Sequence, residues 1–244
     1  GPEFVLDTEL AAKAIAGKRR LRIRTDATFE VEEARSLYLH EIETHIFTAQ
    51  NGAAQPQLDF LDSGGPLSTK TQEGLAVFSE LYAKSLTLDR LRRLVERVRL
   101  VAMAEDGAGF LDLYRYLTDR GAEPKAAYTD AARVCRGGLV QGGAPFTKDA
   151  CYCKGIVQNY AFMRAAIQQD RAALIPFLFV GKVAHEDVPV LYAHVTDGIV
   201  KPPPHLPAIF DDMNGLAIWI CYSSFFSRLG SAAIAEYYGK LMAV

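Results

Sequence analysis

Residues 37–47 read LYLHEIETHIF and place two histidines, His40 and His45, five positions apart. An acidic residue, Glu41, follows the first histidine directly, so the stretch carries the pattern H-E-x-x-x-H. Apolar residues recur around this pattern at helical spacing. The sequence therefore predicts one helix over about residues 31–51, with both histidines inside it.

The five-residue spacing of His40 and His45 does not suit a regular α-helix. Side chains four residues apart differ by about 40° around the helix axis, whereas side chains five apart differ by about 140°. An undistorted helix cannot aim both imidazoles at one point. A π-bulge accommodates one extra residue in a turn, and such bulges occur mostly at functional sites. We therefore expect a distorted turn between the two histidines.

Two imidazoles and a carboxylate are a common ligand set for catalytic zinc, which leaves a fourth position to water. Glu73 is the candidate third ligand because it lies in the expected first turn of the next helix, across a loop long enough to reverse the chain. Glu80, two turns further along, is the second choice. Glu41 points to a different side of the first helix from His40 and is the candidate general base for the attacking water.

A histidine on a helix is ordinarily a core or surface residue, and this interpretation applies to each histidine singly. Here an adjacent acid, two histidines on one helix and an early glutamate on the next helix coincide. Their coincidence favours a Zn²⁺ site over chance placement.

The remainder of the chain has mostly helical periodicity. Further helices are expected over about residues 68–86, 87–103, 109–120, 126–135, 148–168 and 215–241, with Ser68 or Thr69 and Thr147 as N-caps. The last of these is apolar nearly throughout and is expected to be buried. A short strand is expected at residues 21–24. The sequence thus predicts a mainly α fold with a small β component, of the zincin-like type in which a Glu-bearing helix follows the HExxxH helix.

Composition narrows the class of protein. The chain has 244 residues, half of them hydrophobic, and 27 basic against 29 acidic residues. This balance gives no drive toward nucleic acid or an anionic membrane, and no apolar run is long enough to cross a bilayer. The four cysteines are too few for a disulfide framework, so a cytoplasmic location and ordinary buried thiols are expected.

Residues 1–4 resemble the remnant left when a tag is cleaved, so the sequence sets them apart from the fold. Residues 5–244 are then expected to form a single metallopeptidase catalytic domain.

A second motif follows the first. Residues 71–76 read TQEGLA, and together with HEIETH they resemble the QEGLA-motif metallopeptidases, a group that includes microtubule-associated tyrosine carboxypeptidase. The RG at 136–137, the GAPFTKD at 143–149 and the GKV at 181–183 resemble further patterns of this family, so the resemblance spans about residues 20–190.

This resemblance implies a zinc carboxypeptidase that removes a C-terminal tyrosine, or in some relatives glutamate, from a protein or peptide tail. It also supports Glu73 as a ligand. Family members usually carry Gly where this chain has Glu43, which is a departure that either alters the pocket or faces solvent. They are also longer before the metal motif, so an N-terminal region of theirs is expected to be absent here.

A carboxypeptidase needs a cation near the metal for the terminal carboxylate of its substrate. Arg136 and Lys148 flank the glycine-rich loop and are the first candidates, followed by Arg133 one helical turn earlier. Tyr152, one turn beyond Lys148, can offer a phenol to the transition state. His185 and His194 are further candidates for stabilising an oxyanion, although ordinary loop histidines are the simpler interpretation.

Two alternatives stay open on the residues alone. The HExxxH spacing also occurs in dipeptidyl peptidase III, so the chain is alternatively a zinc peptidase acting from the amino end. It is alternatively a metal-binding regulatory module without turnover, although the intact Glu41 speaks against that.

Overall fold

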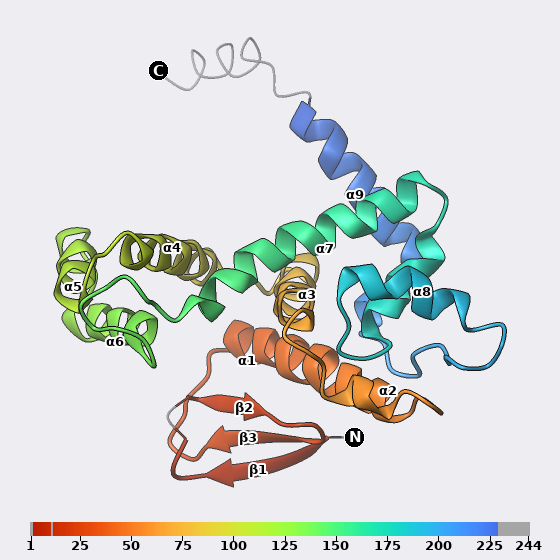
Figure 1. Cartoon of the computed structure of the whole chain (residues 1–244), viewed down its shortest axis with the longest axis horizontal. Helices are drawn as coiled ribbons and strands as arrows, with labels where there is room; N and C mark the ends of the chain where they lie inside the picture. Colours follow the sequence, from red (N-terminus) through yellow and green to blue (C-terminus); the bar gives the residue numbers. More distant parts are fainter. Residues whose placement is uncertain (1, 11, 229–244) are drawn as a thin grey trace.

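The computed structural model describes residues 2–10 and 12–228 and shows a mainly helical protein with one small sheet (Figure 1). The strands are β1 (Glu3–Asp7), β2 (Ala14–Ala16) and β3 (Arg20–Arg24), in the spatial order β1-β3-β2. Strand β1 runs parallel to β3 and β2 runs antiparallel to it. The predicted class, mainly α with a small β component, is confirmed.

A continuous helical rod lies over this sheet and carries both histidines (Figure 1). It consists of α1 (Val31–Leu37), the π-helix η1 (Tyr38–Ile46) and α2 (Phe47–Ala53). Ile42 and Ile46 of η1 are buried against Leu21 of β3. Burial of this apolar face fixes how the rod is rotated about its axis, and so turns His40 and His45 away from the sheet side.

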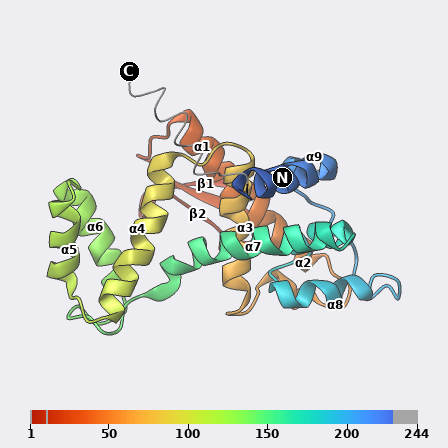
Figure 2. The ribbon, with the colours of Figure 1, turned by 90° about the horizontal axis from the view of Figure 1, so that it is seen from above.

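Two long helices, α3 (Ser68–Tyr82) and α7 (Cys151–Gln168), cross at very short range (Figure 2). A Cβ atom added at Gly74 of α3 would lie 2.0 Å from the carbonyl carbon of Gly155 in α7. The two backbones can approach this closely because both positions at the contact are glycine. The glycine of the QEGLA motif thus has a packing role in holding α3 against α7.

Three helices form a lobe with its own apolar core, on the left in Figure 1. They are α4 (Leu88–Glu105), α5 (Phe110–Asp119) and α6 (Pro124–Cys135). Leu100, Leu113 and Ala131 are fully buried at its centre. The loop after α6 returns through the short 3₁₀ helix η3 (Thr147–Ala150) into α7 and so links the lobe to the helix that crosses α3.

The C-terminal part packs around the other end of α3 and α7. Its helices are η4 (Ala172–Phe179), η5 (His185–Asp187), α8 (Val188–Ala193), η6 (Ala208–Phe210) and α9 (Met213–Arg228), while η2 (Asp59–Asp62) lies in the loop after α2. Phe179 and Phe78 both pack on Phe210 in the larger core. Within residues 2–10 and 12–228, no helix combines the length and apolarity needed to cross a bilayer.

The structure departs from three expectations at chain ends and helix ends. Glu3 and Phe4, which the sequence sets apart with residues 1–4, take part in β1, while Gly1 lies outside the described residues. Neither expected N-cap forms: the hydroxyl of Ser68 donates to the carbonyl of Gly65 instead, and Thr147 lies inside η3. Helix α3 therefore begins early enough that Glu73 lies in its second turn, not its first.

Helix α9 and the cysteines are less buried than predicted. Ile218 and Tyr222 of α9 are more than half exposed, because only one side of this helix packs on the core. The expected helix after residue 228 lies outside the described residues. Among the cysteines only Cys135 is buried, and Cys221 is exposed, so the expectation of four buried thiols is wrong.

Candidate metal centre

The predicted distortion of the histidine helix is confirmed. All of Tyr38–Ile46 is π-helical, so hydrogen bonds reach back five residues instead of four. The hydroxyl of Thr44 follows the same pattern and donates to the carbonyl of Leu39 at 3.0 Å. The wider turn brings His40 and His45 onto one face, with ring centroids 4.9 Å apart.

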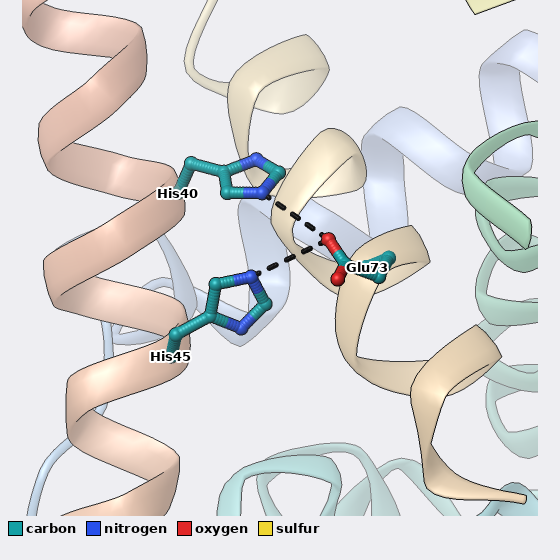
Figure 3. Close-up of side chains that lie close together, drawn as sticks. All are labelled: His40, His45 and Glu73. Atoms are coloured by element: carbon teal, nitrogen blue, oxygen red, sulfur yellow. Dashed lines mark ion pairs between the residues drawn. The ribbon is translucent and has the colours of Figure 1, made fainter. Parts of the chain in front are cut away.

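Glu73 completes the cluster from the neighbouring helix α3. Its Oε2 lies 3.5 Å from Nε2 of His40 and 3.5 Å from Nε2 of His45. Figure 3 shows both rings directed at this carboxylate. A tetrahedral zinc ion with bonds of about 2.0–2.1 Å holds its ligand atoms about 3.4 Å apart. The three donor atoms, all within 4.8 Å of one another, therefore fit a Zn²⁺ ion.

The electrostatics of the cluster favour a positive charge between these side chains. Burial opposes the charged form of His40, but hydrogen bonds to Glu73 and Glu80 outweigh it and raise the pKa to about 9. Burial also opposes the Glu73 carboxylate, yet the contacts with His40 and His45 hold the pKa of Glu73 well below its usual range. A bound divalent cation supplies the positive charge that this environment stabilises.

Glu80, the second choice as a ligand, has a different position in the structure. Its Oε1 accepts a hydrogen bond from Nδ1 of His40 at 2.7 Å, on the side of the ring opposite Glu73. Ser36 donates to Glu80 at 2.6 Å, and Arg90 of α4 forms a bidentate ion pair with it. A carboxylate that accepts from Nδ1, the outer nitrogen of His40, fixes the tautomer of the ring. Nε2 is then free to bind a metal.

The sequence does not reveal Ser36 and Arg90 as parts of this site. Ser36 lies one helical turn before His40 and Arg90 lies on α4, and neither belongs to one of the two motifs. The spacing of Glu73 and Glu80 on α3 is the signal that Glu80 faces the same way. The structure thus reassigns Glu80 from a ligand to a residue that orients one.

Glu41, the candidate general base, faces a cleft beside the metal centre. It is half-buried and lines this cleft beside His40 and Tyr152. Its negative charge contributes to the raised pKa of His40, which shows that the carboxylate is close to the cluster. The side chain is therefore open to the cleft and near the metal position.

Two of the four candidate substrate residues reach the metal centre. Nζ of Lys148 lies 3.2 Å from Oε1 of Glu73, so this cation contacts a ligand. The ring of Tyr152 stacks on His40, with centroids 6.2 Å apart. Burial and the negative charge of Glu73 raise the pKa of Tyr152 well above its usual range, so the phenol keeps its proton and can donate it in a hydrogen bond.

The other two candidates are tied to Asp149, which is buried. Arg133 forms a bidentate ion pair with it, and Arg136 lies 4.0 Å from it while stacking on Phe146. Arg133 also lines the cleft beside Glu41. Asp149, which no feature of the sequence marks as part of the site, therefore anchors the start of η3 and thereby positions Lys148.

His185 and His194 have structural partners instead of catalytic ones. Both ring nitrogens of His185 contact side chains, Thr71 at 3.2 Å and Asn159 at 3.2 Å. His194 is exposed and pairs with Asp197 on the surface. The interpretation of both as ordinary histidines agrees with these contacts.

A family model described as microtubule-associated tyrosine carboxypeptidase matches residues 2–228. The chain belongs to the microtubule-associated tyrosine carboxypeptidase family. A comparison with individually curated proteins finds no match. Membership places the chain in a family of carboxypeptidases, in agreement with the resemblance of its motifs.

The QEGLA motif of this tyrosine carboxypeptidase family member now has a structural account. Gln72 accepts a hydrogen bond from Thr48 of α2 at 2.8 Å and thereby ties α3 to the histidine rod. Glu73 follows at the metal position, and Gly74 permits the contact with Gly155. The three residues thus join the rod, the third ligand and α7 within one turn of helix.

Glu43, the departure from the pattern of the resemblance, is half-buried near Asp211. Burial and the charge of Asp211 raise its pKa above the usual range. Glu43 is not among the residues that line the cleft beside the metal centre. The departure therefore lies outside the cleft.

Proposed function

We propose that this protein is a zinc-dependent carboxypeptidase that removes a C-terminal residue, tyrosine first and glutamate second, from a protein or peptide tail. The observation that carries the proposal is the separation of Oε2 of Glu73 from the two imidazole nitrogens, 3.5 Å in each case. That spacing matches tetrahedral zinc, and a His₂Glu set is one that zinc peptidases use. Family membership supports the carboxypeptidase class.

The residues of this chain divide the chemistry between them. Zinc, when bound, supplies a Lewis acid that polarises a carbonyl and makes water more acidic. Glu41 accepts a proton from the attacking water and returns it to the leaving amine. Tyr152 and Lys148 present an O–H and an N–H donor next to the ligands, where negative charge develops on the scissile carbonyl oxygen.

The orienting contacts keep the site rigid during these steps. Glu80 holds the ring of His40 by its outer nitrogen, and Arg90 neutralises Glu80. Ile42 and Ile46 lock the opposite face of the π-helix into the core. Rigid donors lose no free energy to reorganisation as charge develops, which is the main benefit of a preformed site.

A peptide library with varied last residues tests the proposal. The purified protein with bound zinc is mixed with peptides that end in a free carboxylate and with matched C-terminal amides, and products are identified by mass spectrometry. We expect loss of one residue from the free-acid peptides alone, fastest for tyrosine. Glu41→Gln should reduce the rate by about a hundredfold or more while zinc content stays unchanged.

Other outcomes separate the alternatives. Cleavage that is unaffected by amidation, with products released from the amino end, would establish an aminopeptidase or dipeptidyl peptidase. Stoichiometric zinc with no cleavage of any peptide would leave a metal-binding regulatory module. If Glu41→Gln leaves the cleavage rate unchanged, Glu41 is not the general base.

A further inference from the structure

A cleft of about 870 Å³ opens beside the metal centre. Its lining includes His40 and Glu41 on the rod, Tyr152 on α7 and the facing sides of α4 and α6. This volume is within the range of pockets that enclose small ligands. The cleft is therefore large enough for the last residue of a peptide at the metal.

The side of the cleft formed by α4 and α6 is mainly basic, with Asp89 as its acid, whereas glutamates of the rod line the other side. Four arginines line it: Arg90, Arg93, Arg97 and Arg133. Two of them are neutralised by buried acids, because Arg90 pairs with Glu80 and Arg133 pairs with Asp149. These two arginines serve the metal centre and the loop before α7. The remaining pair, Arg93 and Arg97, lie one helical turn apart on α4.

Arg97 is poorly satisfied by the protein. Its Nη2 lies 3.6 Å from Oδ1 of Asp130, which is beyond hydrogen-bond distance, and its Nε is buried without a hydrogen-bond partner. Burial and the charge of Arg133 lower the pKa of Arg97. Arg97 thus has a charged partner in Asp130, but at 3.6 Å this contact is longer than a hydrogen bond and leaves N–H donors of the guanidinium available. The Arg97 side chain is 20% exposed and lines the cleft, so an anion there can share the contact that Arg97 makes with Asp130.

Tyr152 links this cation to the metal centre. Its ring stacks on His40, and its phenol lies within the electrostatic reach of both Arg97 and Arg133. Arg97, Tyr152 and His40 line the same cleft, so a peptide end bound there can contact all three. By contrast Lys148 contacts Glu73 and Arg136 stacks on Phe146, and neither lines this cleft.

We propose that Arg97 binds the α-carboxylate of the last residue of the substrate, with Arg93 as a second cation one turn away. This inference rests on the proposed function, because it assigns the terminal carboxylate to the cleft of that site. A carboxylate can accept two parallel hydrogen bonds from one guanidinium, which no amide or internal peptide group can match. Arg97 is thus the residue that restricts the enzyme to chain ends.

Binding of matched peptides to a non-cleaving variant tests this assignment. The zinc-loaded Glu41→Gln protein is titrated with a fluorescent peptide ending in a free Tyr carboxylate and with its C-terminal amide, and each Kd is measured by anisotropy. We expect the free acid to bind at least about tenfold more tightly. Adding Arg97→Gln should bring the ratio of the two Kd values close to one, whereas Arg97→Lys should keep part of it.

Two further variants serve as controls. Arg92→Gln changes an exposed arginine of the same helix outside the cleft and should leave the ratio unchanged. Arg93→Gln changes an exposed cleft residue and should lower the ratio in part, which keeps the test valid if Arg97→Gln fails to fold.

The outcomes separate a failure of the Arg97 assignment from a failure of the carboxypeptidase proposal. Equal weakening of both peptides by Arg97→Gln, with the ratio preserved, would overturn the assignment. So would an effect that depends on an upstream glutamate in the peptide, because Arg97 would then contact the tail and not its end. If the Glu41→Gln parent binds acid and amide equally, and the unaltered enzyme also cleaves both, the carboxypeptidase proposal itself fails.

Discussion

At the scale of single residues, the metal centre depends on side chains that touch no substrate. His40 uses both nitrogens, one toward Glu73 at 3.5 Å and one toward Glu80 at 2.7 Å. Fixing the outer nitrogen selects the tautomer and the ring orientation that a metal requires. Glu80 in turn is held by Arg90, so the ligand geometry extends into the α4 lobe.

Glu80→Gln tests this orienting contact. An amide is neutral and can present its NH₂ group to Nδ1, so it holds the His40 tautomer less strictly and leaves Arg90 without its charged partner. Zinc affinity, measured by competition with a chromophoric chelator, should fall by about 10- to 100-fold. Glu105→Gln, at an exposed position, is the control and should leave the affinity unchanged. An unchanged affinity in Glu80→Gln would show that the contact is dispensable.

At the scale of elements, the site depends on two helices with unusual geometry. The π-helical segment Tyr38–Ile46 aligns histidines that a regular helix would separate by about 140°. Helix α3 then has to lie close to both the rod and α7 so that Glu73 meets the two imidazoles. The contact of Gly74 with Gly155 sets the distance between α3 and α7.

Gly74→Ala tests how strictly that distance is set. Its Cβ would lie 2.0 Å from a backbone atom of Gly155, so the two helices must separate. Overpacking of this kind lowers the free energy of unfolding by about 1–3 kcal/mol, to be measured by urea denaturation. Gly65→Ala is a matched control because no atom lies within 4 Å of its added Cβ. Equal midpoints for the two variants would contradict the close-packing argument.

At the scale of the whole molecule, the candidate metal centre brings together parts that are distant in the sequence. His40 and His45 belong to the rod over the sheet, while Glu73 belongs to the helix that crosses α7 (Figures 1 and 2). Glu80 and Arg90 connect the same centre to the α4 lobe. An ion held by this cluster would therefore stabilise the packing of the rod, of α3 and of the lobe together.

Removal of the metal tests this coupling. Zinc at a free concentration of about 100 times its Kd should stabilise the folded protein by about 2.7 kcal/mol, so treatment with a chelator should lower the melting temperature. His45→Ala, which removes one ligand, should melt at the same temperature with and without zinc. A chelator effect of the same size in His45→Ala would show that zinc acts elsewhere on the protein.

The sequence by itself determined the local features of this protein. The spacing of His40 and His45 predicted the π-helix, because helix geometry is a property of successive residues. Helical periodicity predicted most helices, and the two motifs predicted the family. Strands β1 and β2 escaped prediction because short strands take their identity from their neighbours in the sheet.

Only the tertiary structure decided which distant residues meet. Glu73 and Glu80 lie on one face of α3, and the sequence cannot tell which of them faces the histidines, since that depends on how α3 rotates against the rod. The crossing of α3 and α7 at Gly74 fixes that rotation, so Glu73 faces the metal position and Glu80 the outer nitrogen of His40. The arginines of α4 reach the cleft for the same reason, because packing of the lobe, not spacing along the chain, brings them there.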